Sequence, residues 1–172
     1  MSKHKVFISH YHDDDDEVNK FVSKFAYEKD VFTPKIVGED YDTTINSDDS
    51  NYIMRKIRED YLTDSTVTIV LIGKDTWKRK YVDWEIASTL RNDPNNKRSG
   101  LIGIFLPGRN KNNTTIPERL QDNIDIGYAD LYEYPTYAYY ELAEWIDKAF
   151  EKKENNYYDV DNSRDLYKNN RN

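Results

Sequence analysis

The chain has 172 residues, of which 37% are hydrophobic and 33% charged, with a net charge of −7 and no cysteine. This length fits one domain with a sizeable core. The acidic balance argues against nucleic acid as the main partner, and the lack of cysteine excludes disulfides, thiol catalysis and cysteine-ligated zinc. No apolar run exceeds four residues, whereas a membrane span needs about 20, and the N-terminus leaves no room for a signal peptide. These features predict a cytoplasmic protein that binds neither membrane nor nucleic acid.

Short apolar runs alternate with amphipathic segments, which predicts alternating strands and helices. The predicted elements, in chain order, are a strand at 5–9, a helix at 14–27, a strand at 31–37, a helix carrying 53–61, a strand at 66–72, a helix at 80–91, a strand at 100–106, a short helix near 117–122, a strand within 126–131 and a helix at 136–152. Pro34 favours an edge strand, because proline cannot donate to the ladder. The alternation predicts an α/β fold with a doubly wound, five-stranded parallel sheet.

One domain is expected over residues 1–153, followed by a polar tail at 154–172. A long acidic loop is expected at 38–50. The residues available to cap the helix after this loop are Asp48, Asp49 and Ser50. The tail side chains that could dock on the domain are Tyr157, Tyr158, Val160, Leu166 and Tyr167.

Acidic residues and histidines near the first strand raise the question of a metal site. The run Asp13–Asp16 starts the first predicted helix, where negative charge complements the helix dipole, and its spacing does not match a calcium loop. His4, His10 and His12 show no metal-ligand spacing. We therefore assign no metal, and expect His10 to line a pocket beyond the first strand.

A carboxylate borders the predicted buried face of the helix at 80–91. At about 100° per residue, the apolar residues of this helix form one stripe, and Glu85 lies beside it, between Tyr81 and Val82. The helix follows a buried central strand, so Glu85 is expected near the carboxyl edge of the sheet, where such folds bind ligands. Helix geometry alone leaves two roles open for Glu85: a functional carboxylate, or a boundary glutamate paired with a Lys or Arg. For Trp84, the sequence likewise leaves open whether the side chain forms a wall of the site or packs in the core or an interface.

Several nucleotide-binding folds are excluded by their motifs. The chain contains neither G-x-G-x-x-G nor G-x-x-x-x-G-K-[ST], so it has no Rossmann fingerprint and no P-loop. Tyr11-His-Asp-Asp is not the phosphate loop of a flavodoxin, and the third strand ends in Gly73-Lys74, where a response-regulator receiver needs an aspartate.

Three segments resemble the TIR (Toll/interleukin-1 receptor) domain family. Val6-Phe7-Ile8-Ser9 resembles its first motif, loop 38–50 occupies the position of its BB loop, and Tyr81-Val-Asp-Trp-Glu85 resembles the W-x-x-x-E motif of TIR domains that cleave NAD. The block from Thr68-Ile-Val-Leu-Ile-Gly73 through Lys-Asp-Thr-Trp to Val-Asp-Trp-Glu-Ile86 is most similar to the ThsB branch of bacterial Thoeris anti-phage systems. The resemblance covers about residues 5–150 and implies a flavodoxin-like sheet with the strand order 2-1-3-4-5. One departure is that Tyr81 stands where the family has tryptophan.

The resemblance also implies an activity. Thoeris TIR proteins convert NAD⁺ into a cyclic ADP-ribose-type signal that activates a partner effector, ThsA, so NAD⁺ is the substrate and no cofactor is expected. By correspondence, Glu85 is the catalytic residue, Ser9 and His10 contact phosphate or ribose, and Tyr81 or Trp84 forms an aromatic wall. Loop 38–50 would be a lid, and self-association or a phage-derived trigger would control activity. The alternative is a non-catalytic TIR module that signals by homotypic assembly.

Overall fold

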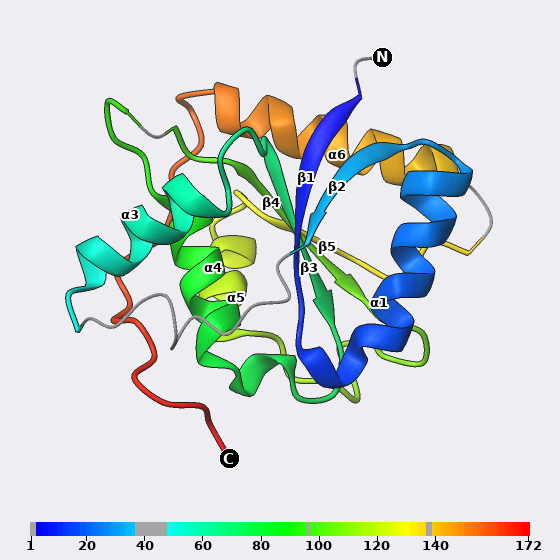
Figure 1. Cartoon of the computed structure of the whole chain (residues 1–172), viewed down its shortest axis with the longest axis horizontal. Helices are drawn as coiled ribbons and strands as arrows, with labels where there is room; N and C mark the ends of the chain where they lie inside the picture. Colours follow the sequence, from blue (N-terminus) through cyan, green and yellow to red (C-terminus); the bar gives the residue numbers. More distant parts are fainter. Residues whose placement is uncertain (1–2, 37–47, 96, 137–138) are drawn as a thin grey trace.

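The computed structural model describes residues 3–36, 48–95, 97–136 and 139–172. At its centre is a five-stranded sheet in the order β2-β1-β3-β4-β5 (Figure 1). The strands are β1 (His4–Ser9), β2 (Phe32–Ile36), β3 (Val67–Ile72), β4 (Gly100–Phe105) and β5 (Asp130–Tyr132), and each pair of neighbours is parallel. The predicted flavodoxin-like α/β fold and its strand order are therefore confirmed.

The central strand β3 is buried in all six of its residues. Its β-branched run sits between β1 and β4, so side chains on both of its faces are covered. The edge strand β2 contains Pro34 and is only partly buried. Both strands lie where their residue types predict.

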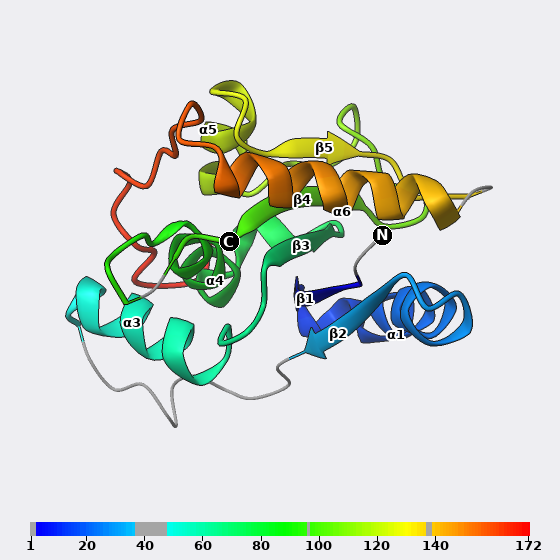
Figure 2. The same ribbon diagram turned by 90° about the horizontal axis from the view of Figure 1, so that it is seen from above.

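Helices cover both faces of the sheet. They are α1 (Asp15–Phe21), α3 (Ser50–Asp60), α4 (Lys80–Leu90), α5 (Glu118–Asp125) and α6 (Tyr139–Glu154), with shorter helical segments η1 (His12–Asp14), η2 (Val22–Glu28) and η3 (Thr76–Lys78). One apolar cluster joins the sheet to α1, η2 and α6, and a second joins it to α4 and α5. A third cluster joins β1 to α3 and α4. Figure 2 shows α3, α4 and α5 grouped on one side of the strands.

Two predicted elements differ from the observed ones. The helix expected at 14–27 is divided into a 3₁₀ turn, α1 and the π-helical segment η2. The buried residues of η2 are Val22, Phe25 and Ala26. The fifth strand begins later than expected and ends at Tyr132. The predicted cap of α3 is resolved in favour of Asp49, whose side chain accepts hydrogen bonds from the backbone N–H groups of Asn51 and Tyr52.

None of the helices in the described ranges is long and apolar enough to cross a membrane. The expected lid loop at 38–50 lies mostly outside the described residues, which resume at residue 48.

Candidate active site

The carboxyl ends of β1 and β3 bring a serine and a glutamate together. Along β1, Phe7 packs with α3 and α4, whereas Val6 and Ile8 face the cluster of α1 and α6. Because side chains alternate along a strand, Ser9 points to the same face as Phe7. There its Oγ donates a hydrogen bond of 2.8 Å to Oε1 of Glu85. The sequence correspondence assigns Ser9 to phosphate or ribose and Glu85 to catalysis, and it did not predict a direct hydrogen bond between them.

Both partners of this hydrogen bond are buried. Ser9 is 0% and Glu85 6% exposed. The serine hydroxyl fixes the direction of the carboxylate in a region of low dielectric, where charge acts strongly on a nearby group. The pair can therefore orient a carboxylate toward a developing positive charge.

Glu85 is more deeply buried than its position on the helical wheel predicts. The wheel gives α4 one buried stripe and a solvent face, but every residue from Val82 to Leu90 is buried. This stretch has no solvent face because α3 and the C-terminal segment (residues 161–171) cover the side of α4 that faces away from the sheet. Glu85 is therefore buried by segments that the helical wheel does not include.

The two aromatic residues beside Glu85 pack on each other. The rings of Tyr81 and Trp84 meet edge to face with centroids 5.3 Å apart. Trp84 belongs to the cluster formed by β1, α3 and α4, and its indole N–H donates to the carbonyl of Tyr167 at 2.8 Å. This environment favours the packing alternative for Trp84, whereas Tyr81 lies at the border of the cluster.

His10 is held beside the first helix. Its side chain is 5% exposed and its Nε2 lies 2.8 Å from Oδ1 of Asp15. His12 lies on the same turn, and possible ligand atoms of His10, His12 and Asp15 all fall within 4.8 Å of one another. These three side chains could hold a metal ion, a convergence that sequence spacing did not reveal because the η1 turn folds the chain back on itself.

A second carboxylate at this edge was missed. Asp14 follows β1, and its Oδ2 is buried without a hydrogen-bond partner among the described residues. It lies against Gly73 at the end of β3, where an added Cβ would be 2.2 Å from that oxygen. Burial, reinforced by the charge of Asp13, raises the pKa of Asp14. A carboxylate in such surroundings is a candidate functional group, and Gly73 was the sequence signal that could have indicated it.

A five-stranded parallel sheet in the order β2-β1-β3-β4-β5 matches the TIR-like, flavodoxin-like fold. In a comparison with protein families, residues 7–111 match the family described as Thoeris protein ThsB, TIR-like domain. The match covers more than half of the 172 residues, so the chain belongs to this family. A search of curated proteins found no match.

Proposed function

We propose that this protein is an NAD⁺-cleaving enzyme of Thoeris anti-phage defence, which makes a cyclic ADP-ribose-type signal for a partner effector, ThsA. Membership of the ThsB TIR-like family supports the defence context. The observation that carries the enzymatic part is the buried hydrogen bond from Ser9 to Glu85 at the carboxyl edge of the sheet. That bond supports the proposal because it orients a carboxylate near the carboxyl edge of the sheet, where open α/β folds commonly bind ligands.

The proposed reaction breaks the bond between C1′ of the ribose and the nicotinamide nitrogen. The electron pair leaves with nicotinamide, and positive charge develops on the ribose. Glu85 would stabilise that charge electrostatically, as carboxylates do for oxocarbenium-like transition states. A nucleophilic group at the adenosine end then bonds to C1′ and releases one proton, for which Glu85 is the proposed acceptor. The products are a cyclic ADP-ribose, nicotinamide and one proton.

The other predicted site residues have supporting roles in this proposal. Ser9 is a positioning residue because it orients the carboxylate of Glu85. His10 would contact phosphate or ribose beyond the end of β1, and Tyr81 would form the aromatic wall. Trp84 would support that wall through its edge-to-face contact with Tyr81. Cyclisation over hydrolysis requires that these groups keep water from the reacting carbon.

The proposal is tested by incubating the purified protein with NAD⁺, measuring nicotinamide release and identifying the product by mass spectrometry. The protein is prepared from uninfected and from phage-infected cells, and assayed over a range of concentrations. We expect Glu85→Gln to lower the rate by about 100-fold or more, as loss of an electrostatic group in an active site does. Glu144→Gln is the matched control, because Glu144 is an exposed glutamate on α6.

Two results would overturn the proposal. Equal product formation by wild type and Glu85→Gln would show that Glu85 is not catalytic. A wild-type protein that releases no nicotinamide in any of these preparations, but assembles with other TIR domains, would favour the non-catalytic signalling module.

A further inference from the structure

The C-terminal segment after α6 runs along the outer side of α4. In Figure 2 this red segment passes beside α5 and α4. Its contacts with α4 and the residues just before it are Asn162 Nδ2 to Ala87 O at 3.0 Å, Trp84 Nε1 to Tyr167 O at 2.8 Å, Tyr167 N to Asp83 Oδ2 at 2.9 Å, Lys80 N to Asn170 Oδ1 at 2.9 Å and Arg171 N to Lys78 O at 2.7 Å. The segment therefore follows α4 along most of its length.

A buried ion pair joins this segment to two helices. Arg119 of α5 is 1% exposed, and its Nε donates to Oδ1 of Asp83 on α4 at 2.9 Å. The same guanidinium donates to Asn162 Oδ1 at 2.9 Å and to the carbonyl of Asp165 at 3.0 Å. Hydrogen bonds that involve a charged group are the stronger kind. The tail is therefore part of the buried polar network and not a loose extension.

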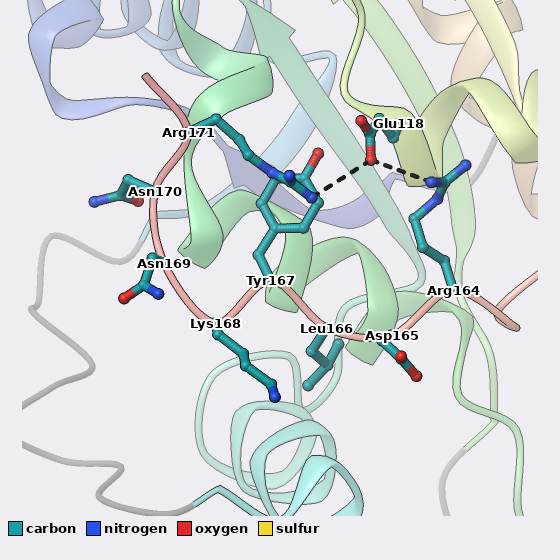
Figure 3. Close-up of a pocket in the computed structure, with 9 residues that line it drawn as sticks. All are labelled: Glu118, Arg164, Asp165, Leu166, Tyr167, Lys168, Asn169, Asn170 and Arg171. Atoms are coloured by element: carbon teal, nitrogen blue, oxygen red, sulfur yellow. Dashed lines mark hydrogen bonds and ion pairs between the residues drawn. The ribbon is translucent and has the colours of Figure 1, made fainter.

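A second, more exposed set of contacts secures the end of the segment. Figure 3 shows Glu118 between Arg164 and Arg171 in a pocket lined by the tail. Arg164 makes two hydrogen bonds of 2.9 Å to Asp122 and one of 3.2 Å to Glu118, whereas Arg171 lies 3.9 Å from Glu118. Each exposed pair contributes little alone, but together they set the path of the tail across α5.

The two sides of α4 thus have different partners. On the sheet side, Glu85 accepts the hydrogen bond of Ser9. On the other side, the two preceding residues, Asp83 and Trp84, bind the backbone of Tyr167. A shift or rotation of α4 would change both sets of contacts, because a helix moves as a rigid body over a few turns.

We propose that residues 161–171 form a clamp that positions Glu85 by fixing α4 against the sheet. Asp83, Trp84, Arg119 and Asn162 are its positioning residues. Residues 161–171 lie outside the stretch that matches the ThsB family, 7–111. Its effect on catalysis rests on the proposed NAD⁺ cleavage, whereas its effect on α4 does not.

The test uses the full chain with Asn162→Ala, which removes the side-chain contacts to Ala87 O and Arg119. Hydrogen exchange of the α4 amides is measured together with nicotinamide release. We expect exchange in α4 to rise by about 3- to 10-fold, with β3 and β4 unchanged, and kcat to fall by a similar factor at constant KM. Asn155→Ala is the matched control, since its side chain accepts a hydrogen bond from Tyr157 N within the tail itself.

A second pair of variants keeps the clamp testable if Asn162→Ala folds poorly. Trp84→Phe removes the indole N–H, and Trp145→Phe, in α6 and stacked on Tyr132, is its control. Unchanged α4 exchange in both Asn162→Ala and Trp84→Phe would overturn the clamp. Faster α4 exchange with unchanged kcat would overturn its positioning role. A wild type that does not cleave NAD⁺ would defeat the proposed function alone, because the exchange measurement still decides whether the clamp exists.

Discussion

Two aspartates at opposite sides of the site differ in how the fold treats their charge. Asp83 is 4% exposed, pairs with Arg119 and accepts a backbone N–H from Tyr167. Asp14 is partly buried against Gly73, and its Oδ2 has no hydrogen-bond partner among the described residues. The carboxylate of Asp83 has its hydrogen-bond partners on the side of α4 that faces the tail. The carboxylate of Asp14, at the carboxyl edge of the sheet, has an oxygen without a partner among the described residues.

This difference separates structural from functional chemistry. A saturated buried carboxylate fixes packing, because breaking its pair leaves an uncompensated charge. An unsatisfied carboxylate costs stability, and such costs concentrate at functional sites. The carboxyl edge of the sheet therefore carries both the Ser9–Glu85 pair and the one buried carboxylate oxygen left without a partner in the described part of the chain.

The largest expected change in stability comes from breaking the buried ion pair between Asp83 and Arg119. Arg119→Met removes the buried cation but keeps a side chain of similar length, so Asp83 is left as a buried charge. We expect the free energy of unfolding to fall by about 3–5 kcal/mol, measured by urea denaturation. Arg164→Met, which removes a guanidinium whose side chain is 40% exposed, should cost about 1 kcal/mol or less.

Equal losses in these two variants would contradict the distinction between the buried and exposed pairs. A further variant sharpens it: Asp83→Leu combined with Arg119→Met replaces the whole pair by apolar groups. This double variant should recover part of the lost stability, because it leaves no unpaired buried charge. Recovery stays incomplete because the buried N–H of Tyr167 loses its acceptor.

The fold was more predictable from the sequence than the site. The continuous β-branched run of β3 and the proline of β2 predict their places in the sheet, because burial and hydrogen-bonding limits act locally. The depth of Glu85 was not predictable, since residues 161–171, which cover α4, are far away in sequence. The contact between Asp14 and Gly73 is also long-range. Periodicity describes one helix at a time and cannot show which distant segment packs on it.

A smaller loss of stability is expected from crowding the carboxylate of Asp14 with a side chain at position 73. Gly73→Ala would place a Cβ 2.2 Å from Oδ2 and 2.8 Å from Oδ1 of Asp14, so the carboxylate must move. We expect a loss of about 1–2 kcal/mol in chemical denaturation. In an Asp14→Ala background the same substitution should cost less than about 0.5 kcal/mol, because the clashing group is gone. A cost that is the same in both backgrounds would show that backbone crowding, and not the carboxylate, is responsible.

The smallest effect concerns the charge of Asp14 itself. Burial and the charges of Asp13 and Asp75 raise its pKa above the ordinary value of 3.8, against the opposing influence of His10 and Arg109. The folded protein therefore binds the proton of Asp14 more tightly than the unfolded chain does. The stability contributed by this group is fully present below pH 3.8 and is lost as the pH rises through the pKa of the folded state.

Asp14→Asn removes the titration while keeping the size of the side chain. At pH 7 we expect Asp14→Asn to be more stable than wild type by about 0.5–1 kcal/mol. This advantage should shrink as the pH falls below the pKa of Asp14 in the folded protein. Urea denaturation of both proteins between acidic and neutral pH measures the difference at each value, so that groups common to both cancel. An advantage that grows toward acid would mean that the pKa of Asp14 is lowered by folding, as for a satisfied carboxylate such as one in an ion pair. The contrast with Asp83 would then be lost.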